Sequence, residues 1–532
     1  NDYEISLGSV TDESLSESVT MLENMRSSLD DFSYPALRDD QQLTYDILDD
    51  YSKLELDNAK LYLYSEVLQP STGTHTQLPV LLAEYTFRCE KDVTDYLELL
   101  SLLPSYFDEI IQFEKSKANA GLFMSKQNAD TVISQCQDFI ENPKSCFLIE
   151  TFDNRIESLS TLSTSAKEEY RSQNETYVLK KIIPAYKNLA AAIEELKDSG
   201  SNKGGLCNYE DGKDYYEYLV RYSTGSSDSI KDLQKQVEQK RKEDLLQLSE
   251  LLTKNPILAK ESESYQLDTS DPSQILAQLK ETIKKDFPEA PDANFTVKYV
   301  DEALEDYLSP AFYLTSPIDD YKENSIYINE GSHYEKMKLF TTLAHEGFPG
   351  HLYQNVFANT SGLPSVRQLL NYSGYTEGWA TYVESYAYDY AAQYLSRENT
   401  TQESQRQAAS EAIPSAALTR AAWLNRSVNL CIYSLLDIGI HYRGWTPSQA
   451  ARFLNAFGIR DASAISEIYR YIVETPANYL KYYVGYLNFL DLKEEKQTLL
   501  GEDFDLKAFH QQILAIGPVQ FPVLKKYINQ AL

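Results

Sequence analysis

The chain has 532 residues, and its 49 lysines and arginines against 80 aspartates and glutamates give it a net charge of −31. This charge argues against nucleic acid and anionic membrane surfaces as partners, because both are bound through basic patches. The 20 phenylalanines, 41 tyrosines and 3 tryptophans exclude a chain that is disordered throughout. The length allows about three or four compact units, or one large intertwined fold.

Signals for the cellular location are few. The stretch nearest to a membrane span, residues 428–440, is interrupted by polar side chains and is shorter than the roughly 18 to 20 apolar residues that a membrane helix needs. The chain starts at Asn1 rather than at methionine, so we expect a removed leader and an extracytoplasmic location, secreted or lipid-anchored. The five cysteines include no CxxC pair, although Cys136 and Cys146 could form one bridge.

The first two segments, residues 1–200 and 201–290, are predicted to be helical, the first as a scaffold. Apolar residues recur at helical spacing in five stretches: 40–63, 78–103, 163–197, 226–254 and 273–285. We expect Pro184 to interrupt the third of these helices, and a break between Pro256 and Pro272. The Gly- and Ser-rich segment 198–212 is predicted to be a loop.

The third segment, residues 291–532, is predicted to be a catalytic region in which a small sheet precedes a helix. Three short segments rich in strand-forming residues are predicted as strands: 295–299, 311–314 and 325–329. We expect the last of these to be an edge strand that could hold an extended peptide. From Tyr334 onward the chain is again predicted to be helical, with loops near three glycines: Gly362, Gly444 and Gly517. The predicted fold class is therefore mainly α, with a small β-sheet beside the active-site helix.

The segment TLAHEGFPGHLYQ brings two histidines close together. His345 is followed directly by Glu346, and His351 comes six residues after His345. Neutral imidazoles are the commonest zinc ligands in hydrolases, and an adjacent glutamate can act as a base. Either histidine alone would more often be a buried structural residue, but the pair with its intervening acid favours a metal site.

The spacing of this pair differs from His-Glu-x-x-His, in which four residues return to nearly the same helix face. Six residues turn a regular helix by about 600°, so the two rings would point to different sides. Pro349 removes an amide donor and Gly350 relaxes the backbone, so we predict a two-residue bulge that returns His351 to the face of His345. The zinc interpretation depends on this geometry.

A third metal ligand is expected further along the chain. Glu377 in YTEGWATYVESY opens a predicted helix, and we prefer it as the ligand. Glu384 lies seven residues later on roughly the same face and is the alternative. Two histidines and one glutamate would leave a coordination position open, as catalytic zinc requires.

Later residues could complete a hydrolase. Asp437 and His441 are four residues apart, so on a helix they could pair, and the carboxylate would favour an imidazolium that stabilises an oxyanion. A purely structural pair is equally compatible with this spacing. Tyr482 could donate to a tetrahedral intermediate, although any one of 41 tyrosines more often packs. Neither a phosphate-binding GxxxxGK[ST] loop nor a GxSxG nucleophile elbow occurs.

Four segments together resemble a known family, the bacterial group called domain of unknown function eight-eight-five, which is related to gluzincin-type zinc metallopeptidases. The segments are HEGFPGH, YTEGWATYVE, DIGIHYRGWTPSQA and PANYLKYYVG, and weaker likeness covers most of the chain. The resemblance implies a mostly helical zincin-like fold with zinc on His345, His351 and Glu377. It also implies that Glu346 is the general base and that His441 and Tyr482 face the substrate.

Two positions depart from the family pattern. Leu352 stands where the family usually has a further histidine, so we assign no role to that position. The residues Pro476-Ala477-Asn478 replace the family's PGQ, which puts substrate contacts near Asn478 in doubt but leaves the metal site unaffected.

These observations lead us to expect a zinc-dependent peptidase that hydrolyses peptide bonds with a metal-activated water. One rival is a metal-dependent amidase acting on a non-peptide amide, such as a cell-wall fragment, which would share every ligand. A second rival is a non-catalytic lipoprotein that binds a peptide or another ligand. The presence of Glu346 argues against this second rival, because a binding protein needs no base beside its first ligand.

Overall fold

The structure is a computed structural model. It describes residues 3–530 apart from 259–264, 301, 303–304, 306–307, 319–320, 333–335 and 398–413. Most of the described residues are helical, and one small sheet lies beside α13 (Lys336–Glu346), so the predicted fold class is confirmed. None of the described helices combines the length and apolar character needed to cross a bilayer.

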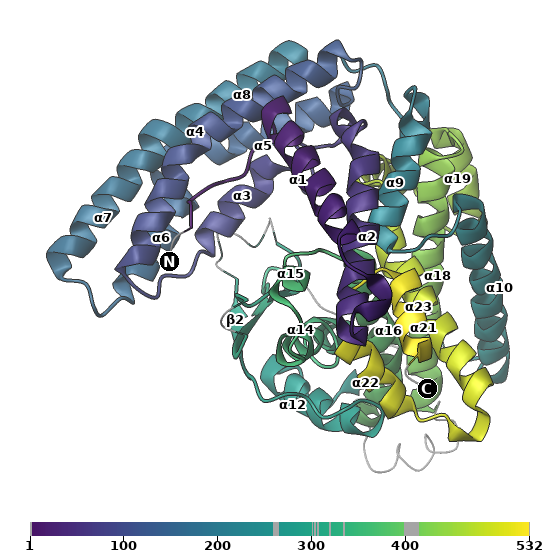
Figure 1. The fold of residues 1–532 in the computed structure, drawn as a ribbon. Helices are drawn as coiled ribbons and strands as arrows, with labels where there is room; N and C mark the ends of the chain where they lie inside the picture. Colours follow the sequence, from purple (N-terminus) through teal and green to yellow (C-terminus); the bar gives the residue numbers. More distant parts are fainter. Residues whose placement is uncertain are drawn as a thin grey trace.

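Six N-terminal helices form an arm around a hydrophobic core of their own (Figure 1). They are α3 (Thr74–Ala83), α4 (Glu90–Asn119), α5 (Lys126–Glu141), α6 (Phe147–Glu157), α7 (Thr164–Tyr177) and α8 (Ile183–Leu196). A single π-helical turn, Val178–Ile182, joins α7 to α8 just before Pro184, which lacks an amide donor, so the expected interruption is confirmed. The expected helix over 78–103 is wrong as one element. The chain breaks at residues 84–89, and the Asp92 carboxylate accepts the Arg88 and Cys89 amides to start α4.

Cys136 and Cys146 are free thiols in the core of this arm. Burial raises the pKa of Cys136 to about 12 and that of Cys146 to about 11. The bridge that their spacing allowed is not formed. Both side chains behave as small apolar groups that fill the core.

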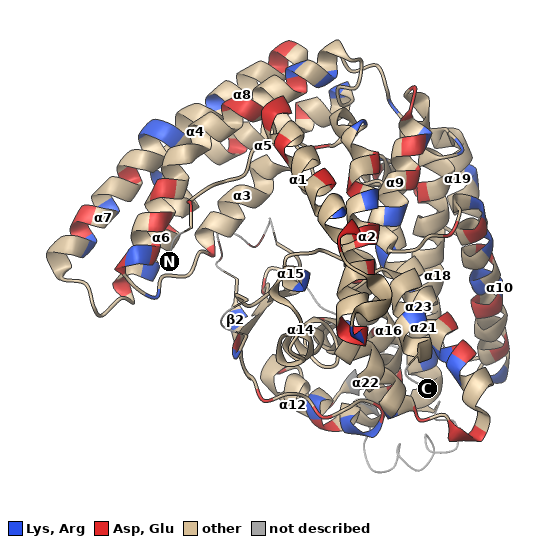
Figure 2. Cartoon of the chain, viewed as in Figure 1, with Lys and Arg blue, Asp and Glu red and all other residues tan. Residues whose placement is uncertain are grey.

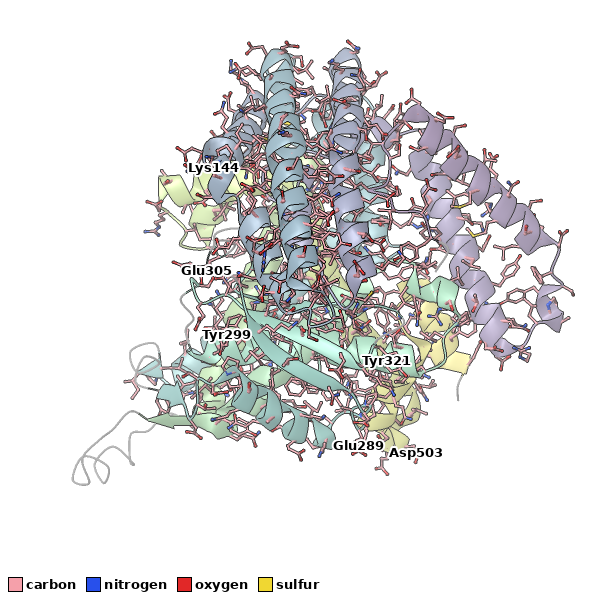
Figure 3. The ribbon with its side chains drawn as sticks, turned by 90° about the vertical axis from the view of Figure 1, so that its left-hand side faces the viewer. Lys144, Glu289, Tyr299, Glu305, Tyr321 and Asp503 are labelled. Carbon is pink, nitrogen blue, oxygen red and sulfur yellow. The ribbon has the colours of Figure 1, made fainter. Side chains whose placement is uncertain are left out.

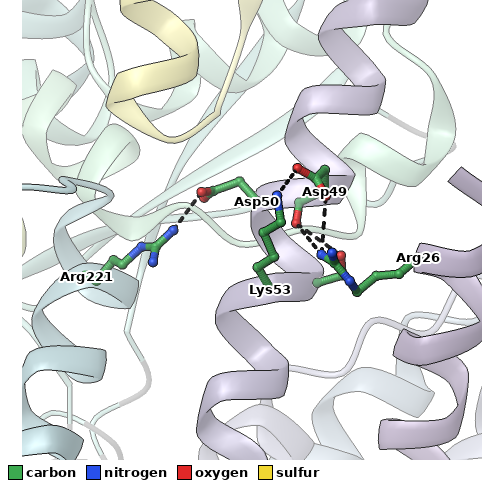
Figure 4. Close-up of polar contacts among 6 residues, drawn as sticks. Arg26, Asp49, Asp50, Lys53 and Arg221 are labelled. Atoms are coloured by element: carbon green, nitrogen blue, oxygen red, sulfur yellow. Dashed lines mark hydrogen bonds and ion pairs between the residues drawn. The ribbon is translucent and has the colours of Figure 1, made fainter. Parts of the chain in front are cut away.

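The first two helices, α1 (Asp12–Asp30) and α2 (Asp39–Ala59), lie against the rest of the chain rather than within the arm. Ion pairs join them to each other and to α9 (Gly212–Thr224): Arg26 lies 3.2 Å from Asp49, and Arg221 lies 2.7 Å from Asp50 (Figure 4). Partly exposed pairs of this kind contribute at most about 1 kcal/mol each. Ile47 of α2 is fully buried in the main core, and this apolar contact is the stronger anchor.

The remaining helices form the main body, and the helices expected at 226–254 and 273–285 are confirmed. The body contains α10 (Ile230–Lys254), α12 (Pro272–Thr282), α14 (His351–Thr360), α15 (Ser365–Gln368), α16 (Ser373–Ala391), α18 (Ser415–His441), α19 (Pro447–Ala456), α20 (Ala462–Glu474), α21 (Asn478–Leu500), α22 (Leu506–Ile516) and α23 (Phe521–Gln530). Charges of both signs alternate along the outer helix α10 (Figure 2). The loops expected near three glycines are present, each glycine having a positive φ: Gly362, Gly444 and Gly517. Tyr334 and part of the stretch between Pro256 and Pro272 lie outside the described residues.

The three predicted strands form one sheet in the order β2-β4-β3. Their bounds are β2 (Asn294–Tyr299), β3 (Ala311–Leu314) and β4 (Glu323–Ile328), and Figure 3 shows the sheet between the labelled Tyr299 and Tyr321. β4 runs parallel to β2 and antiparallel to β3. The expectation that residues 325–329 form an edge strand is therefore wrong, because β4 is paired on both sides, and β3 is an edge instead. A second pair of strands, β1 (Tyr265–Leu267) and β5 (Leu395–Arg397), was not predicted.

Side chains of β4 alternate between two cores. Ile326 and Ile328 are buried in the main core, which also contains Phe340 and Leu343 of α13. Tyr327 points the other way, into the core of the N-terminal arm, where it stacks on Phe312. The sheet therefore joins the arm to the body and supports α13 from one face.

Candidate active site

The helix that carries the first histidine is interrupted before the second. α13 ends at Glu346, residues 347–350 form a turn, and α14 begins at His351. The expected two-residue bulge is therefore wrong in detail, because the chain stops one helix and starts another. Gly350 is required there, since a Cβ atom at this position would lie 1.8 Å from the His345 carbonyl oxygen. This close approach folds His351 back towards His345.

The two histidines and Glu377 converge on one point. His345 Nε2 and His351 Nε2 each lie 3.5 Å from Glu377 Oε2. The imidazole ring centres are 4.9 Å apart, and the rings are nearly perpendicular. A tetrahedral zinc ion with bonds of about 2.1 Å separates its ligand atoms by about 3.4 Å. The three side chains thus match a zinc site in donor type and in spacing.

The charges around His345 also suit a cation. Burial lowers the pKa of His345, but the carboxylates of Glu377, Glu384 and Glu346 outweigh it and raise that pKa to about 10. Burial likewise opposes ionisation of Glu377, yet hydrogen bonding to His345 and His351 holds the pKa of Glu377 well below its usual range. A pocket that stabilises a positive charge at this point can take a divalent cation in place of the proton.

Glu384, the alternative ligand, lies on the other side of His345. Its Oε2 is 3.5 Å from His345 Nδ1, whereas Glu377 approaches Nε2. The second oxygen of Glu384 accepts a hydrogen bond of 3.2 Å from Arg426 Nε on α18. A carboxylate behind a metal-binding histidine orients the ring and raises its basicity. Glu384 therefore has the geometry of a positioning residue rather than of a ligand.

Glu346 lies beside the three converging side chains. A carboxylate oxygen of Glu346 is within 4.8 Å of a ring nitrogen of each histidine. Its Oε2 accepts a hydrogen bond of 2.9 Å from the main-chain N–H of Tyr313 in β3. The edge of the sheet therefore fixes this carboxylate, as general base catalysis requires.

A close helix crossing places Glu377. Gly378 of α16 faces Gly485 of α21, and a Cβ atom at Gly378 would lie 2.5 Å from the backbone of Gly485. The turn between the two histidines is held to the same helix, because the Trp379 indole donates a hydrogen bond of 2.9 Å to the Pro349 carbonyl. Trp379, two residues after Glu377, thus fixes the turn that carries His351.

Two cavities meet at this cluster. One has a volume of about 520 Å³ and is lined by His351 and Glu377, and the other has a volume of about 310 Å³ and is lined by Glu384 and Arg426. His345, Glu346 and Tyr482 line both of them, together with Ser309 and Ala311. A larger cavity of about 1160 Å³ lies between α5 and α20, but none of its lining residues is a histidine. The chemistry of the lining, rather than the size, therefore marks the site.

Tyr482 lies beside the cluster and lines both cavities. Its ring centre lies 6.4 Å from that of His345, and no described residue forms a hydrogen bond with its hydroxyl. Burial, and then the charges of Glu377 and Glu346, raise the pKa of Tyr482, so the hydroxyl keeps its proton. It can donate that proton in a hydrogen bond to a group in either cavity.

His441 is not brought to this cluster, which corrects the expectation that it faces the substrate. It is 1% exposed, its Nδ1 accepts the Leu206 amide and its Nε2 donates to the Ile472 carbonyl. Burial lowers the pKa of His441 to about 4, so it is a neutral ring rather than an imidazolium. The expected pairing with Asp437 is also wrong, because that carboxylate accepts from the Tyr216 hydroxyl and the Ala477 amide.

Sequence reasoning missed several residues of the site. Arg426 and the Tyr313 amide come from distant parts of the chain, and no motif pointed to them. Trp379 stood inside the EGWA segment but carried no assigned role. Leu352, which occupies the family's further histidine position, is buried in the main core and packs there.

Comparisons with known proteins agree with this fold. The chain resembles the crystal structure of a candidate lipoprotein from Colwellia psychrerythraea, with a TM-score of 0.83 and 20% identity over 98% of this chain and 92% of that one. It also resembles a candidate lipoprotein of unknown function from Shewanella oneidensis, with a TM-score of 0.66 and 17% identity over 98% and 93% of the two chains. No curated protein matches the chain. The family of bacterial proteins of unknown function DUF885 matches residues 2–528, and the chain belongs to that family.

Proposed function

We propose that the protein is a zinc-dependent peptidase. The observation that carries the proposal is the convergence of His345 Nε2 and His351 Nε2 on Glu377 Oε2, each at 3.5 Å, beside the carboxylate of Glu346. Bound zinc would act as a Lewis acid and bring the pKa of a bound water towards about 7. His345, His351 and Glu377 would hold the metal, and Glu384 would orient the His345 ring.

The chain's own groups can move the protons of a hydrolysis. Glu346, held by the Tyr313 amide, would accept the proton of the attacking water and pass it to the leaving amine. The hydroxyl of Tyr482, which opens onto both cavities, would donate a hydrogen bond to the developing oxyanion.

Strand β3 supports a peptide as the substrate. Tyr313 turns its N–H away from β4 and towards Glu346, so its carbonyl also points to the open edge. Ala311, two residues earlier, has the same orientation and lines both cavities. An extended peptide could add to this edge by main-chain hydrogen bonds and cross the cluster from one cavity to the other.

We further propose an extracytoplasmic location. The two solved structures described above are of candidate lipoproteins, and this chain shares their fold.

Metal content measured by mass spectrometry tests the metal part of the proposal. We expect about one zinc per chain in the wild type after incubation with zinc, and loss of it in His351→Ala. His75→Ala is the matched control, because His75 is a buried histidine of α3 in the N-terminal arm. No zinc in the wild type would contradict the proposal, and so would equal loss in both variants.

Turnover of a peptide library tests the catalytic part. Glu346→Gln keeps a side chain that can accept the Tyr313 amide but removes the base. We expect it to retain zinc and to lose about 10²- to 10⁴-fold in kcat. Unchanged turnover in Glu346→Gln would refute the assigned role.

A further inference from the structure

Arg367 is a buried cation without a carboxylate partner. It comes from α15 and is 4% exposed. One terminal nitrogen donates to two main-chain carbonyls, Ile516 at 2.6 Å and Pro518 at 3.2 Å, while Nε has no hydrogen-bond acceptor. Among the described residues, no Asp or Glu lies within ion-pair distance of this guanidinium. A guanidinium stays charged when buried, so such a placement is costly unless an anion completes it.

Other half-buried arginines in the chain show how this charge is normally satisfied. Arg426 is paired with Glu384, and Arg470 is paired with Glu474. Arg155 donates to three main-chain carbonyls, and its guanidinium also lies over the faces of Phe87 and Tyr96. Among the described residues, Arg367 has neither a carboxylate in an ion pair nor an aromatic ring beneath its guanidinium.

Arg367 lines the same cavity as the candidate metal ligands. It is the only lysine or arginine among the described residues that line this cavity, which also contains His351 and Glu377. The cavity follows α14, since Asn355 and Asn359 line it on successive turns after His351. Eight residues of helix span about 12 Å, and the Gln368 amide, next to Arg367, donates to Asn359 Oδ1 at 2.7 Å. α15 therefore contacts the end of α14 that is far from the candidate metal ligands. An extended peptide would need only a few residues to span the distance between them.

We propose that Arg367 binds a carboxylate of the substrate, so that the site acts on short peptide acids held by their negative end. This proposal rests on the peptidase function proposed above, because that function makes a peptide the substrate. Binding of the carboxylate by Arg367 can nevertheless be measured without turnover. A guanidinium binds a carboxylate through its N–H donors, and the second terminal nitrogen of Arg367, which does not bind Ile516 or Pro518, is the donor left for the cavity. Leu363, Leu370 and Ile318 also line the cavity, so it can accept an apolar side chain near the carboxylate. The carboxylate is either the free C-terminus or an acidic side chain.

Calorimetric binding of three matched peptides tests the proposal. The probes are N-acetyl-Ala-Ala-Leu with a free carboxylate, the same peptide as a carboxamide, and N-acetyl-Ala-Glu-Leu carboxamide. Each is titrated into the full chain with and without added zinc, because the metal itself can bind a carboxylate. We expect the first probe to bind at least about tenfold more tightly than the second in both conditions, as for a charge-assisted hydrogen-bond pair. Tight binding of the third probe instead would assign the contact to an acidic side chain.

Variants then assign the preference to Arg367. We expect Arg367→Gln to reduce the acid-to-amide ratio to about one, and Arg367→Lys to leave a reduced ratio because one charge remains. Arg155→Gln is the matched control, since it also loses contacts to main-chain carbonyls but lies in α6 of the arm, and it should keep the wild-type ratio. If Arg367→Gln does not fold, the Arg367→Lys ratio and the wild-type comparison still decide.

The outcomes separate this inference from the peptidase proposal. Equal binding of acid and amide to the wild type would overturn the inference, and so would an unchanged ratio in Arg367→Gln or Arg367→Lys. Cleavage of acid and amide at equal rates would leave the peptidase proposal intact and refute the role of Arg367. An acid preference that depends on Arg367, without hydrolysis of any peptide, would refute the peptidase and keep the carboxylate site.

Discussion

Replacing Glu384 by glutamine should weaken zinc binding without removing a ligand. The Glu384 side chain is 7% exposed, and its Oε2 lies 3.5 Å from His345 Nδ1. At an effective dielectric constant of about 20, two unit charges at that distance attract by about 5 kcal/mol, which is an upper bound. Arg426 neutralises part of the carboxylate, and a metal-bound imidazole is neutral, so the relevant quantity is a hydrogen bond to a charged acceptor, about 1.5–3 kcal/mol. We therefore expect zinc affinity to fall about 10- to 150-fold.

The assay is competition for zinc with a chromophoric chelator at fixed pH. Glu474→Gln is the matched control, because Glu474 is a buried carboxylate paired with Arg470 and it lines neither cavity of the site. We expect Glu474→Gln to lower the melting temperature and to leave zinc affinity unchanged. Affinity within twofold of the wild type in Glu384→Gln would refute the reasoning, as would equal losses in both variants.

Two further predictions concern the frame around the site. His441 has a folded-state pKa of about 4, below the unfolded value of about 6.5, so its contribution to stability is complete above pH 6.5 and is lost as the pH falls towards 4. Denaturant titrations should therefore show that the wild type is more stable than His441→Gln and that this difference shrinks by about 2–3 kcal/mol between pH 7.5 and 4.5. Zinc content at pH 7.5 should be the same in both proteins. A difference in stability that does not change with pH would contradict a buried neutral ring. Gly378→Ala should cost about 1–3 kcal/mol, because the new Cβ would meet the Gly485 backbone at 2.5 Å. It should also lower zinc affinity by displacing Glu377, and a fully stable variant with normal affinity would contradict the tight crossing.

Local sequence patterns predicted most elements because their determinants lie within a few residues. Helical apolar spacing predicted α2, α10 and α12, and short runs of strand-forming residues predicted all three strands of the sheet. The break between α3 and α4 was missed, since apolar spacing continues across it. The cap that Asp92 forms there is visible only when its bonds to the Arg88 and Cys89 amides are known. The strand order was also missed, because the residues of one strand do not specify which other strands pair with it.

The sequence by itself predicted the candidate ligands and a departure from regular helix between the two histidines. His345, Glu346 and His351, with Pro349 and Gly350 between the histidines, already required the chain to leave a regular helix. That requirement follows from helix geometry alone, since six residues cannot return to the same face. Glu377 was likewise preferred over Glu384 from its position at the start of a helix.

Only the tertiary structure decided which of the later residues join this cluster. It placed Glu384 behind His345, brought Arg426 and the Tyr313 amide to the carboxylates, and buried His441 among main-chain partners. These outcomes depend on how helices far apart in sequence cross, and the crossing is set by contacts such as Gly378 against Gly485. A buried polar side chain stays charged only where packing gives it a partner, and it can contact a ligand only where packing leaves a cavity beside it. Packing is a property of the whole fold.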